Sequence, residues 1–490
     1  MARRILIICK GPVGTSMSSP GIRSVNMARV LSRALPEARV LLAAPSASDL
    51  VPDAPFRVVS YTRRSLPRLA MGADIVICQG FAPTLLPAFY GRIFVMDFFS
   101  NFMIEGLEYR REHISGDMRE AWLETQRVYL NLQLSLADFV ICSNERQRDA
   151  WLGMMSCLGL IPGTVYDEDA TLRRLVAVAP YGIRPDPIDA PSQPVIRGVI
   201  PGIGPEDRII LWNGGILRWY DPLTLIRAVA RLAPTRPDLR LLFLGTAYPV
   251  AGFDVGGMLP EAIALARDLD LLGTHVIFNE GWLPYDASGQ AMLEADIGVS
   301  TYYENLETHF SYRTRLIDFL WAGTPVVCTR GDVIAEMVES RGLGFAVPQE
   351  DEDALTDALA RLLDDADLRA RCRANLAAIR EELSWERALT PLVEFCRDPR
   401  PVARGKFFRT PDIASRTARY MHARVLEQVK SRWELLLPNP PAPFPRREGG
   451  GLSGDGRAGL GMPRAFVMVA PVIDEDSPVP ARDGGRGGCV

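Results

Sequence analysis

The first half of the chain alternates short apolar runs with longer amphipathic segments. The apolar runs are rich in Val, Ile, Leu and Phe and predict strands at 4–9, 39–43, 75–78, 93–96 and 139–142. Between them, segments such as 24–35 and 118–136 repeat apolar residues at helical spacing. Strands that are apolar at nearly every position are typical of a parallel sheet covered on both faces. This half therefore predicts a doubly wound α/β domain.

The second half repeats the same alternation. Its apolar runs predict further strands at 209–212, 239–244, 276–279, 297–300 and 325–329. A Pro- and Gly-rich stretch without sustained period separates the halves and is typical of a linker. We expect two Rossmann-like, doubly wound domains, residues 1–185 and 206–385, joined by a linker at 186–205 and facing each other across a cleft.

The pattern changes after residue 385. Apolar residues from 413 to 436 recur at helical spacing, so 386–437 is expected to form C-terminal helices that pack back on the N-terminal domain or contact a membrane. Residues 438–490 are rich in Pro, Gly and Arg. Such a composition does not offset the entropy lost on ordering, and a disordered tail is expected there.

Composition narrows the class of protein. Of 490 residues, 48% are apolar and 23% charged, with a net charge of −4, which provides no general basic surface for nucleic acid. The eight cysteines show no metal-ligand or disulfide spacing. No apolar stretch reaches the ~18 residues of a membrane span, so we expect a cytoplasmic protein. Only three of the 55 basic residues are lysines, so phosphate binding would depend on arginine.

The segment 300–329 carries the densest candidate chemistry. A helix is expected from about 312 to 322, with Ser311 as its N-cap. Arg315 and Asp318 would share one face of that helix, and Arg313 lies at its start. Free amides, the helix dipole and guanidinium groups suit a diphosphate, and a carboxylate suits ribose hydroxyls. The alternative is an ion pair between Arg315 and Asp318 on the surface.

This segment resembles the C-terminal signature of glycosyltransferase family 4, which ends in an A-x-G-x-P-V motif. Residues Ala322-Gly323-Thr324-Pro325-Val326 match that end. Matching segments occur in family order from residue 4 to residue 398: 19–23, 143–147, 181–183, 213–215, 243–245, 276–278, 295–299 and 344–348. The resemblance implies the GT-B fold and retaining transfer of a sugar from a nucleotide diphosphate sugar to a hydroxyl acceptor. It also implies that no protein nucleophile is used.

The resemblance also implies roles for residues of the C-terminal half. Asp318 occupies the position of the family's second glutamate, whereas the position of the first falls on Phe310, three residues after Glu307. Glu307 is therefore the candidate for the displaced first carboxylate. Gly215 and Arg218 follow the first strand, where the family has an arginine–lysine pair, and would hold the diphosphate. The neighbouring Asp221 is expected to cap a helix rather than to act in catalysis.

Candidates in the N-terminal half lie after the first and fourth predicted strands. Gly14 and Gly21 belong to a glycine-containing loop that would border the acceptor and the donor phosphates, and Arg23 would clamp an anion or remain solvated. Asp97 ends the fourth predicted strand and would contact the sugar or an acceptor hydroxyl. Its alternative role is to cap the next helix. The carboxylates beyond it are weaker candidates, namely Glu105 and Glu108.

We expect neither a metal nor another cofactor. Four Asp-x-Asp sequences, at 167–169, 268–270, 351–353 and 365–367, occur in loop or helical contexts rather than at strand ends. Arginines and a helix N-terminus would neutralise the leaving diphosphate instead. A pyridoxal-dependent phosphorylase needs a lysine in its C-terminal domain, and the three lysines, Lys10, Lys406 and Lys430, lie outside its strands.

The leading hypothesis is a bacterial glycosyltransferase of surface-polysaccharide or glycoconjugate biosynthesis. Its partners would be a nucleotide sugar donor and a glycan or lipid-linked acceptor, with peripheral contact to the inner face of the membrane. Basic residues mixed with apolar ones at 63–69 and 413–436 motivate the membrane contact. The alternatives are an inactive GT-B scaffold that binds a nucleotide and a sugar-nucleotide epimerase.

Overall fold

The computed structural model describes most of the first 436 residues. The described residues are 2–14, 17–46, 54–80, 85, 88, 91–109, 116–183, 188, 193–246, 257–281, 283, 285–402 and 410–436. The predicted tail at 438–490 lies outside them, as does part of the predicted linker at 186–205. By its internal contacts the chain divides into Met1–Leu437 and Pro438–Val490, and the first unit carries all the features below.

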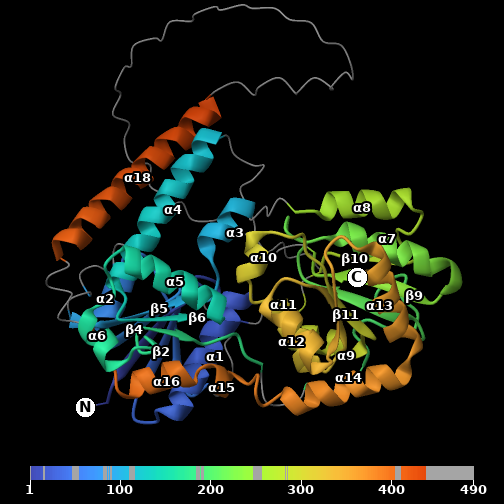
Figure 1. Cartoon of the computed structure of the whole chain (residues 1–490), viewed down its shortest axis with the longest axis horizontal. Coiled ribbons are helices and arrows are strands. Elements are labelled where there is room, and N and C mark those ends of the chain that lie inside the picture. The colour runs from blue at the N-terminus through green and yellow to red at the C-terminus, as the bar shows by residue number, and fades with distance from the viewer. Residues whose placement is uncertain are drawn as a thin grey trace, which may run out of the picture. The chain divides into compact units, whose positions relative to one another are not determined.

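The N-terminal half forms a parallel sheet of seven strands within the described residues, in the order β3-β2-β1-β4-β5-β6-β7 (Figure 1). Its strands are β1 (Arg4–Ile8), β2 (Arg39–Ala44), β3 (Arg57–Ser60), β4 (Ile75–Cys78), β5 (Ile93–Phe98), β6 (Phe139–Cys142) and β7 (Val176–Val178). Its helices are α1 (Ser19–Ala34), α2 (Leu66–Met71), α3 (Phe102–Tyr109), α4 (Gly116–Leu136), α5 (Glu145–Cys157) and α6 (Gly163–Glu168).

The C-terminal half forms a second parallel sheet, with six strands among the described residues in the order β10-β9-β8-β11-β12-β13. Its strands are β8 (Arg208–Asn213), β9 (Leu239–Leu244), β10 (Val276–Asn279), β11 (Ile297–Ser300), β12 (Val326–Thr329) and β13 (Gly344–Val347). Its helices are α7 (Pro222–Leu232), α8 (Leu259–Asp268), α9 (Tyr285–Glu294), α10 (Leu306–Phe310), α11 (Thr314–Ala322), α12 (Val333–Arg341), α13 (Glu352–Asp364) and α14 (Ala366–Ile379).

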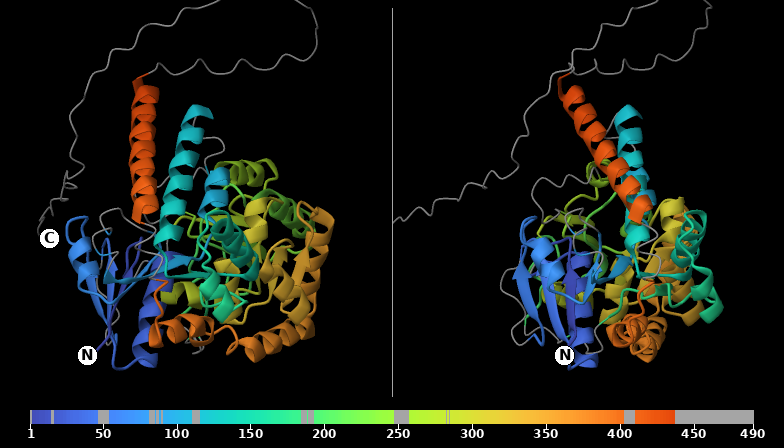
Figure 2. Two further views of the ribbon diagram at one scale, coloured as in Figure 1. Left: turned by 60° about the vertical axis from the view of Figure 1, so that its left-hand side comes forward. Right: turned by 90° about the vertical axis from the view of Figure 1, so that its left-hand side faces the viewer.

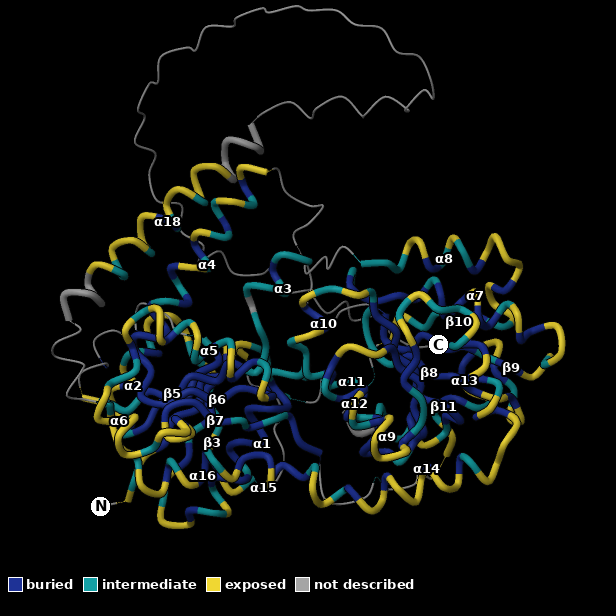
Figure 3. The backbone as a smooth tube through the Cα atoms, viewed as in Figure 1, coloured by how far each residue is buried: buried dark blue, intermediate teal, exposed yellow. Residues whose placement is uncertain are grey.

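Strand β1 shows why the apolar runs predicted covered sheets. Ile5 and Ile7 belong to one hydrophobic core, and Leu6 and Ile8 belong to another on the opposite face. All four side chains are buried, so helices must cover both faces of the sheet. The predicted pair of doubly wound α/β domains is therefore confirmed (Figure 3).

After α14 the chain returns to the N-terminal half. Helices α15 (Trp385–Ala388) and α16 (Thr390–Arg397) contact α1. The Phe395 ring stacks on Phe139 of β6 with centroids 4.3 Å apart. Where the chain crosses between the halves, Ile183 pairs with Ser384 in a parallel bridge, and the backbone of Gly182 packs closely on that of Trp385. The two connections between the halves are thus packed against each other.

The predicted C-terminal helix is present as α18 (Thr410–Leu436) and lies alongside α4 (Figure 2). The rings of Tyr420 and Tyr129 meet across this pair at 5.3 Å. One face of α18 buries Ala423, whereas four large apolar side chains on its other face are 44–54% exposed: Met421, Val425, Leu426 and Val429. No helix in the described part of the chain is long and apolar enough to cross a membrane.

Candidate functional site

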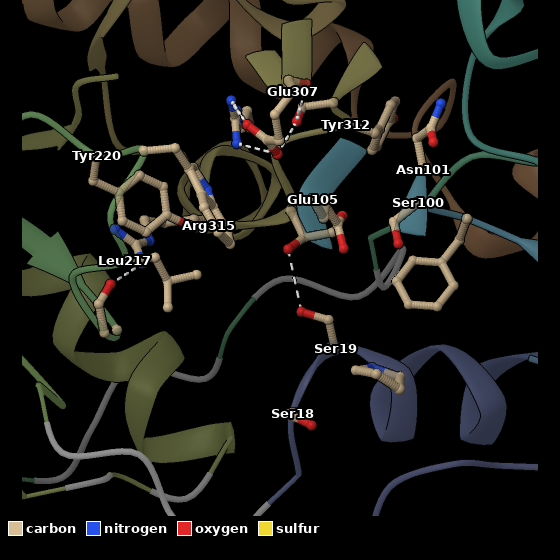
Figure 4. Close-up of a pocket in the computed structure, with 18 of the residues that line it drawn as sticks. Ser18, Ser19, Ser100, Asn101, Glu105, Leu217, Tyr220, Glu307, Tyr312 and Arg315 are labelled. Atoms are coloured by element: carbon tan, nitrogen blue, oxygen red, sulfur yellow. Dashed lines mark hydrogen bonds and ion pairs between the residues drawn. The ribbon is translucent and has the colours of Figure 1, made fainter. Parts of the chain in front are cut away.

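A cavity of about 870 Å³ lies at the carboxyl ends of both sheets. Each sheet reverses its strand order at one point, between β1 and β4 and between β8 and β11. Open parallel sheets bind ligands at such switch points. Residues within two positions of the ends of three of these strands line the cavity, namely Lys10 after β1, Gly214 after β8 and Tyr302 after β11. Figure 4 shows the cavity with Ser19, Glu105, Glu307 and Arg315 on its wall.

Arg315 is held rigidly on the C-terminal side of this cavity. Its guanidinium lies over the Tyr220 ring at 4.4 Å and the Trp212 ring at 4.8 Å. Its Nη2 donates a hydrogen bond of 2.6 Å to the carbonyl of Gly215. Its Nη1 is buried and has no hydrogen-bond partner among the described residues. A guanidinium held rigidly by aromatic rings and a carbonyl, on a residue that lines the cavity, is suited to a phosphate.

The loop after β8 is shaped to fit this arginine. Gly214 has φ +95°, a conformation that side-chain-bearing residues rarely adopt, and a Cβ there would lie 3.4 Å from Arg315 Nη2. Asp318, one helical turn beyond Arg315, also lines the cavity. The structure thus brings Gly215, Arg315 and Asp318 together, as the sequence predicted.

The expected helix start was wrong. A separate short helix, α10, precedes the expected one and is capped by Asn305, whose side chain accepts from the Thr308 amide at 2.9 Å. Ser311 ends α10 instead of starting the next helix, and α11 begins at Thr314. The expected helix is therefore α11, which begins two residues late, and it stays separate from α10 because Ser311 between them has extended backbone geometry.

Glu307 and Arg313 form a buried ion pair on the cavity wall. Arg313 donates to both carboxylate oxygens of Glu307, at 2.7 and 3.1 Å, and the Ser311 hydroxyl donates to Oε1 at 2.5 Å. The guanidinium of Arg313 lies 3.8 Å above the Tyr302 ring. In this structure the guanidinium of Arg313 is already hydrogen-bonded to both carboxylate oxygens of Glu307, so its first role is to neutralise that carboxylate. A direct contact of Glu307 or Arg313 with the donor stays a prediction.

Two N-terminal candidates do not reach the cavity. Asp97 and Arg23 are both fully buried, and their side chains form an ion pair with N–O distances of 2.8–3.1 Å. Arg23 also donates to the backbone carbonyls of Ala179 and Pro180. The expected roles of Asp97 as a substrate contact or helix cap, and of Arg23 as an anion clamp, were therefore wrong, because each residue neutralises the other inside the domain.

The remaining predicted site residues do not line the cavity. Gly21 lies in α1, where a Cβ would approach the Pro12 carbonyl to 2.7 Å, and neither it nor Gly14 lines the cavity. Arg218 also lies off the cavity wall, with its guanidinium 3.9 Å from the Glu261 carboxylate. Asp221 caps α7 as expected, accepting from the Thr224 amide at 2.9 Å.

The N-terminal wall of the cavity contains residues that the sequence indicated weakly or not at all. They come from the loop after β5, from α3 and from α4, and include Ser100, Asn101, Glu105, Trp122 and Gln126. Removal from bulk water, followed by the like charge of Glu307, raises the pKa of Glu105 to about 7. The Ser100 hydroxyl and the cations of Arg313 and Lys10 act in the opposite direction. Glu108 does not line the cavity.

One family model matches the chain. Residues 199–378, which contain the loop after β8 together with α10 and α11, match the family described as "Glycosyl transferases group 1". No curated protein sequence matches the chain.

Solved structures show the same fold over most of the chain. The crystal structure of Anabaena Alr3699/HepE in complex with UDP and glucose is 16% identical, with a TM-score of 0.58, and covers 80% of this chain and 99% of that one. Sucrose-phosphate synthase from Thermosynechococcus elongatus is 18% identical, with a TM-score of 0.54 and coverages of 81% and 98%. WaaG, a glycosyltransferase involved in lipopolysaccharide biosynthesis, is 16% identical, with a TM-score of 0.54 and coverages of 80% and 100%. The chain has the GT-B fold.

Proposed function

We propose that the protein is a retaining glycosyltransferase that moves a sugar from a nucleotide diphosphate sugar to a hydroxyl acceptor in polysaccharide or glycoconjugate biosynthesis. The observation that carries the proposal is Arg315, which lines the cavity and is held there by two aromatic rings and the Gly215 carbonyl. Asp318, one turn further, lines the same cavity, and a carboxylate can accept hydrogen bonds from ribose hydroxyls. Both residues lie inside the matched family segment.

The mechanism depends on binding and electrostatics. Holding donor and acceptor together in the cavity supplies orientation, and charge that develops on the leaving diphosphate is stabilised by Arg315. The first free amides of α11, next to Arg315 in the chain, can add to that stabilisation. The complex of HepE with UDP and glucose and the lipopolysaccharide role of WaaG support a nucleotide-sugar donor and a surface glycan as product.

A donor screen tests this proposal. Purified full-length protein is mixed with a panel of nucleoside diphosphates and their sugars, and its melting temperature is recorded. One base and one sugar are expected to raise the melting temperature, because only a ligand of the folded state does so. NMR of the product formed with a sugar acceptor then reads the anomeric configuration. Donor binding without transfer to any acceptor would instead favour a nucleotide-binding scaffold, and no stabilisation by any nucleotide would contradict the proposal.

We expect transfer without a divalent metal. Arginine and helix amides can carry the diphosphate charge, so activity should stay within about two-fold of its starting value in EDTA. The measurement is the initial rate of nucleoside diphosphate release with and without EDTA. Complete loss that magnesium restores would show that the site uses a metal after all.

The exposed face of α18 supports peripheral attachment to an anionic membrane. Its four exposed apolar side chains share the helix surface with Arg419 and Lys430, which are also exposed. An apolar stripe flanked by cations binds the surface of anionic bilayers. Flotation with vesicles containing anionic lipid is expected to recover the wild-type chain, and Met421→Asp with Val425→Asp should abolish recovery. Equal flotation of both proteins would contradict the attachment.

A further inference from the structure

A lysine that the donor site does not use lies in the cavity on the side of the N-terminal half. Lys10 follows β1, lines the cavity and is exposed there. It is the only lysine in the first 405 residues. Arg315 of the C-terminal half lines the same cavity, so both halves of the protein contribute a cation to it.

The loop after β4 is shaped around the end of the Lys10 side chain. A Cβ on Gly80 would lie 2.1 Å from Lys10 Cε and 2.6 Å from its Nζ, so any other residue at position 80 would displace the ammonium group. The same Cβ position is 3.1 Å from the Tyr129 hydroxyl oxygen, which places that hydroxyl beside the ammonium. An ammonium and a phenolic hydroxyl at one point can both donate hydrogen bonds to phosphate oxygens.

The surroundings of Lys10 leave its charge incompletely balanced. Removal from bulk water lowers the pKa of the ammonium, and this effect outweighs the opposing effects of Cys78 and Glu105. Glu105 does not supply a full negative charge at neutral pH, since its own pKa is raised to about 7. The carboxylate of Glu307 is already hydrogen-bonded to Arg313. An anionic ligand in the cavity would therefore stabilise the Lys10 ammonium.

Helix α4 connects this part of the cavity to the C-terminal helix. Trp122, Gln126 and Tyr129 are spaced i, i+4 and i+7 on α4, so they share one face of the helix. The first two line the cavity, and the ring of Tyr129 meets that of Tyr420 on α18 at 5.3 Å. The α4–α18 pair, with its exposed apolar side chains on α18, therefore leads to the side of the cavity where Lys10 lies (Figure 2).

We propose that Lys10 and Tyr129 form a subsite for a phosphate group of the acceptor, and hence that the protein glycosylates a phosphorylated acceptor. This inference rests on the proposed function and names the class of acceptor for it. The phosphate anchors the acceptor at Lys10, while Arg315 binds the diphosphate of the donor. A lipid phosphate and a sugar phosphate both present this chemistry, and the position of the α4–α18 pair favours the lipid.

Calorimetry with inorganic phosphate tests the subsite on the full chain, with the donor site filled by saturating nucleoside diphosphate. Lys10→Met should weaken phosphate binding at least ~10-fold and leave the affinity for nucleoside diphosphate unchanged. Gly80→Ala keeps the lysine but displaces its ammonium, so it should also weaken phosphate binding. Arg127→Met is the matched control, because Arg127 is a cation of α4 that is exposed and paired with Glu124.

Transfer rates identify the source of the phosphate. Each sugar of a small panel is offered free, as its 6-phosphate, as its decyl glycoside and as its decyl phosphodiester, with the donor that the melting screen selects. A phosphorylated acceptor is expected to have a kcat/KM at least ~10-fold above that of its unphosphorylated counterpart, and Lys10→Met should remove this advantage mainly through KM. Preference for the phosphodiester identifies a lipid phosphate, and preference for the 6-phosphate identifies a sugar phosphate.

The outcomes separate this inference from the proposed function. Unchanged phosphate affinity in Lys10→Met and Gly80→Ala would overturn the subsite, and Gly80→Ala alone decides if circular dichroism shows that Lys10→Met is unfolded. Weaker binding of nucleoside diphosphate in Lys10→Met would assign the lysine to the donor and overturn the inference as well. Equal transfer to phosphorylated and unphosphorylated acceptors would overturn the acceptor class and uphold the proposed function. A wild type that binds no nucleotide and transfers no sugar would overturn the proposed function, even if phosphate still bound through Lys10.

Discussion

Asp97→Ala is expected to destabilise the protein by about 3–5 kcal/mol, because it leaves a buried arginine without its counter-ion. The carboxylate receives three hydrogen bonds from Arg23, at 2.8, 2.8 and 3.1 Å, and both side chains are fully buried. Removing Asp97 takes away the carboxylate that balances the buried Arg23 cation, while the hydrogen bonds of Arg23 to the carbonyls of Ala179 and Pro180 remain. Urea denaturation followed by circular dichroism measures the change.

A double substitution shows whether the loss of stability comes from the unpaired Arg23 charge or from lost packing at Asp97. In Arg23→Met with Asp97→Leu no unpaired charge remains, so the double variant should be more stable than either single change. Nucleotide affinity should stay at the wild-type value in whatever fraction is folded. An Asp97→Asn protein that keeps its stability but loses transfer would contradict this assignment and restore the sequence-based role of Asp97 in the cleft.

Among the described residues, the strands that the sequence did not predict lie only at sheet edges. Most of the central strands of both sheets were predicted within one or two residues of their observed ends, because full burial makes nearly every position apolar. The three strands that were missed, β3, β7 and β13, each lie at a sheet edge. In β3 the terminal residues Arg57 and Ser60 are exposed, so the apolar signal shortens to two valines.

For the candidate site, success of the sequence-based prediction depended on how far apart the residues lie in the chain. Residues that are close in sequence were placed together correctly, since Arg315 and Asp318 need only one helical turn to share a face. The pairing of Arg23 with Asp97 joins residues 74 positions apart, and no local pattern shows it. The raised pKa of Glu105 has a similar origin, because burial of α3 in the folded chain raises it first and the like charge of Glu307, about two hundred residues away, raises it further. The start of α10 does have a local signal in the sequence, because Asn305 is a favoured N-cap residue and its side chain accepts from the amide of Thr308, three residues later.

Arg315→Ala is expected to weaken binding of the free nucleoside diphosphate by roughly ten- to hundred-fold. The change removes a charge-assisted hydrogen bond to phosphate, worth about 1.5–3 kcal/mol. Arg315→Lys should restore only part of the affinity, because an ammonium cannot keep both the Gly215 carbonyl and the phosphate in the planar geometry of the fork. Arg231→Ala is the control, since Arg231 is an arginine of α7 paired with Asp353 on the surface.

Asp318 tests the other end of the same nucleotide. Asp318→Asn keeps the volume of the side chain but replaces one acceptor oxygen, so the affinity for nucleoside diphosphate should fall by about 1–3 kcal/mol. Asp318→Glu should have a mild effect, because glutamate keeps a carboxylate at this position. Glu307→Gln should mainly lower stability, since it removes one of the two carboxylates paired with the buried Arg313 and leaves Asp332, 3.7 Å from its Nε. Calorimetry with free nucleoside diphosphate decides between a donor site and a surface ion pair, because such a pair contributes at most about 1 kcal/mol to stability and nothing to binding. Unchanged affinity in both Arg315→Ala and Asp318→Asn would remove the donor from this face of α11.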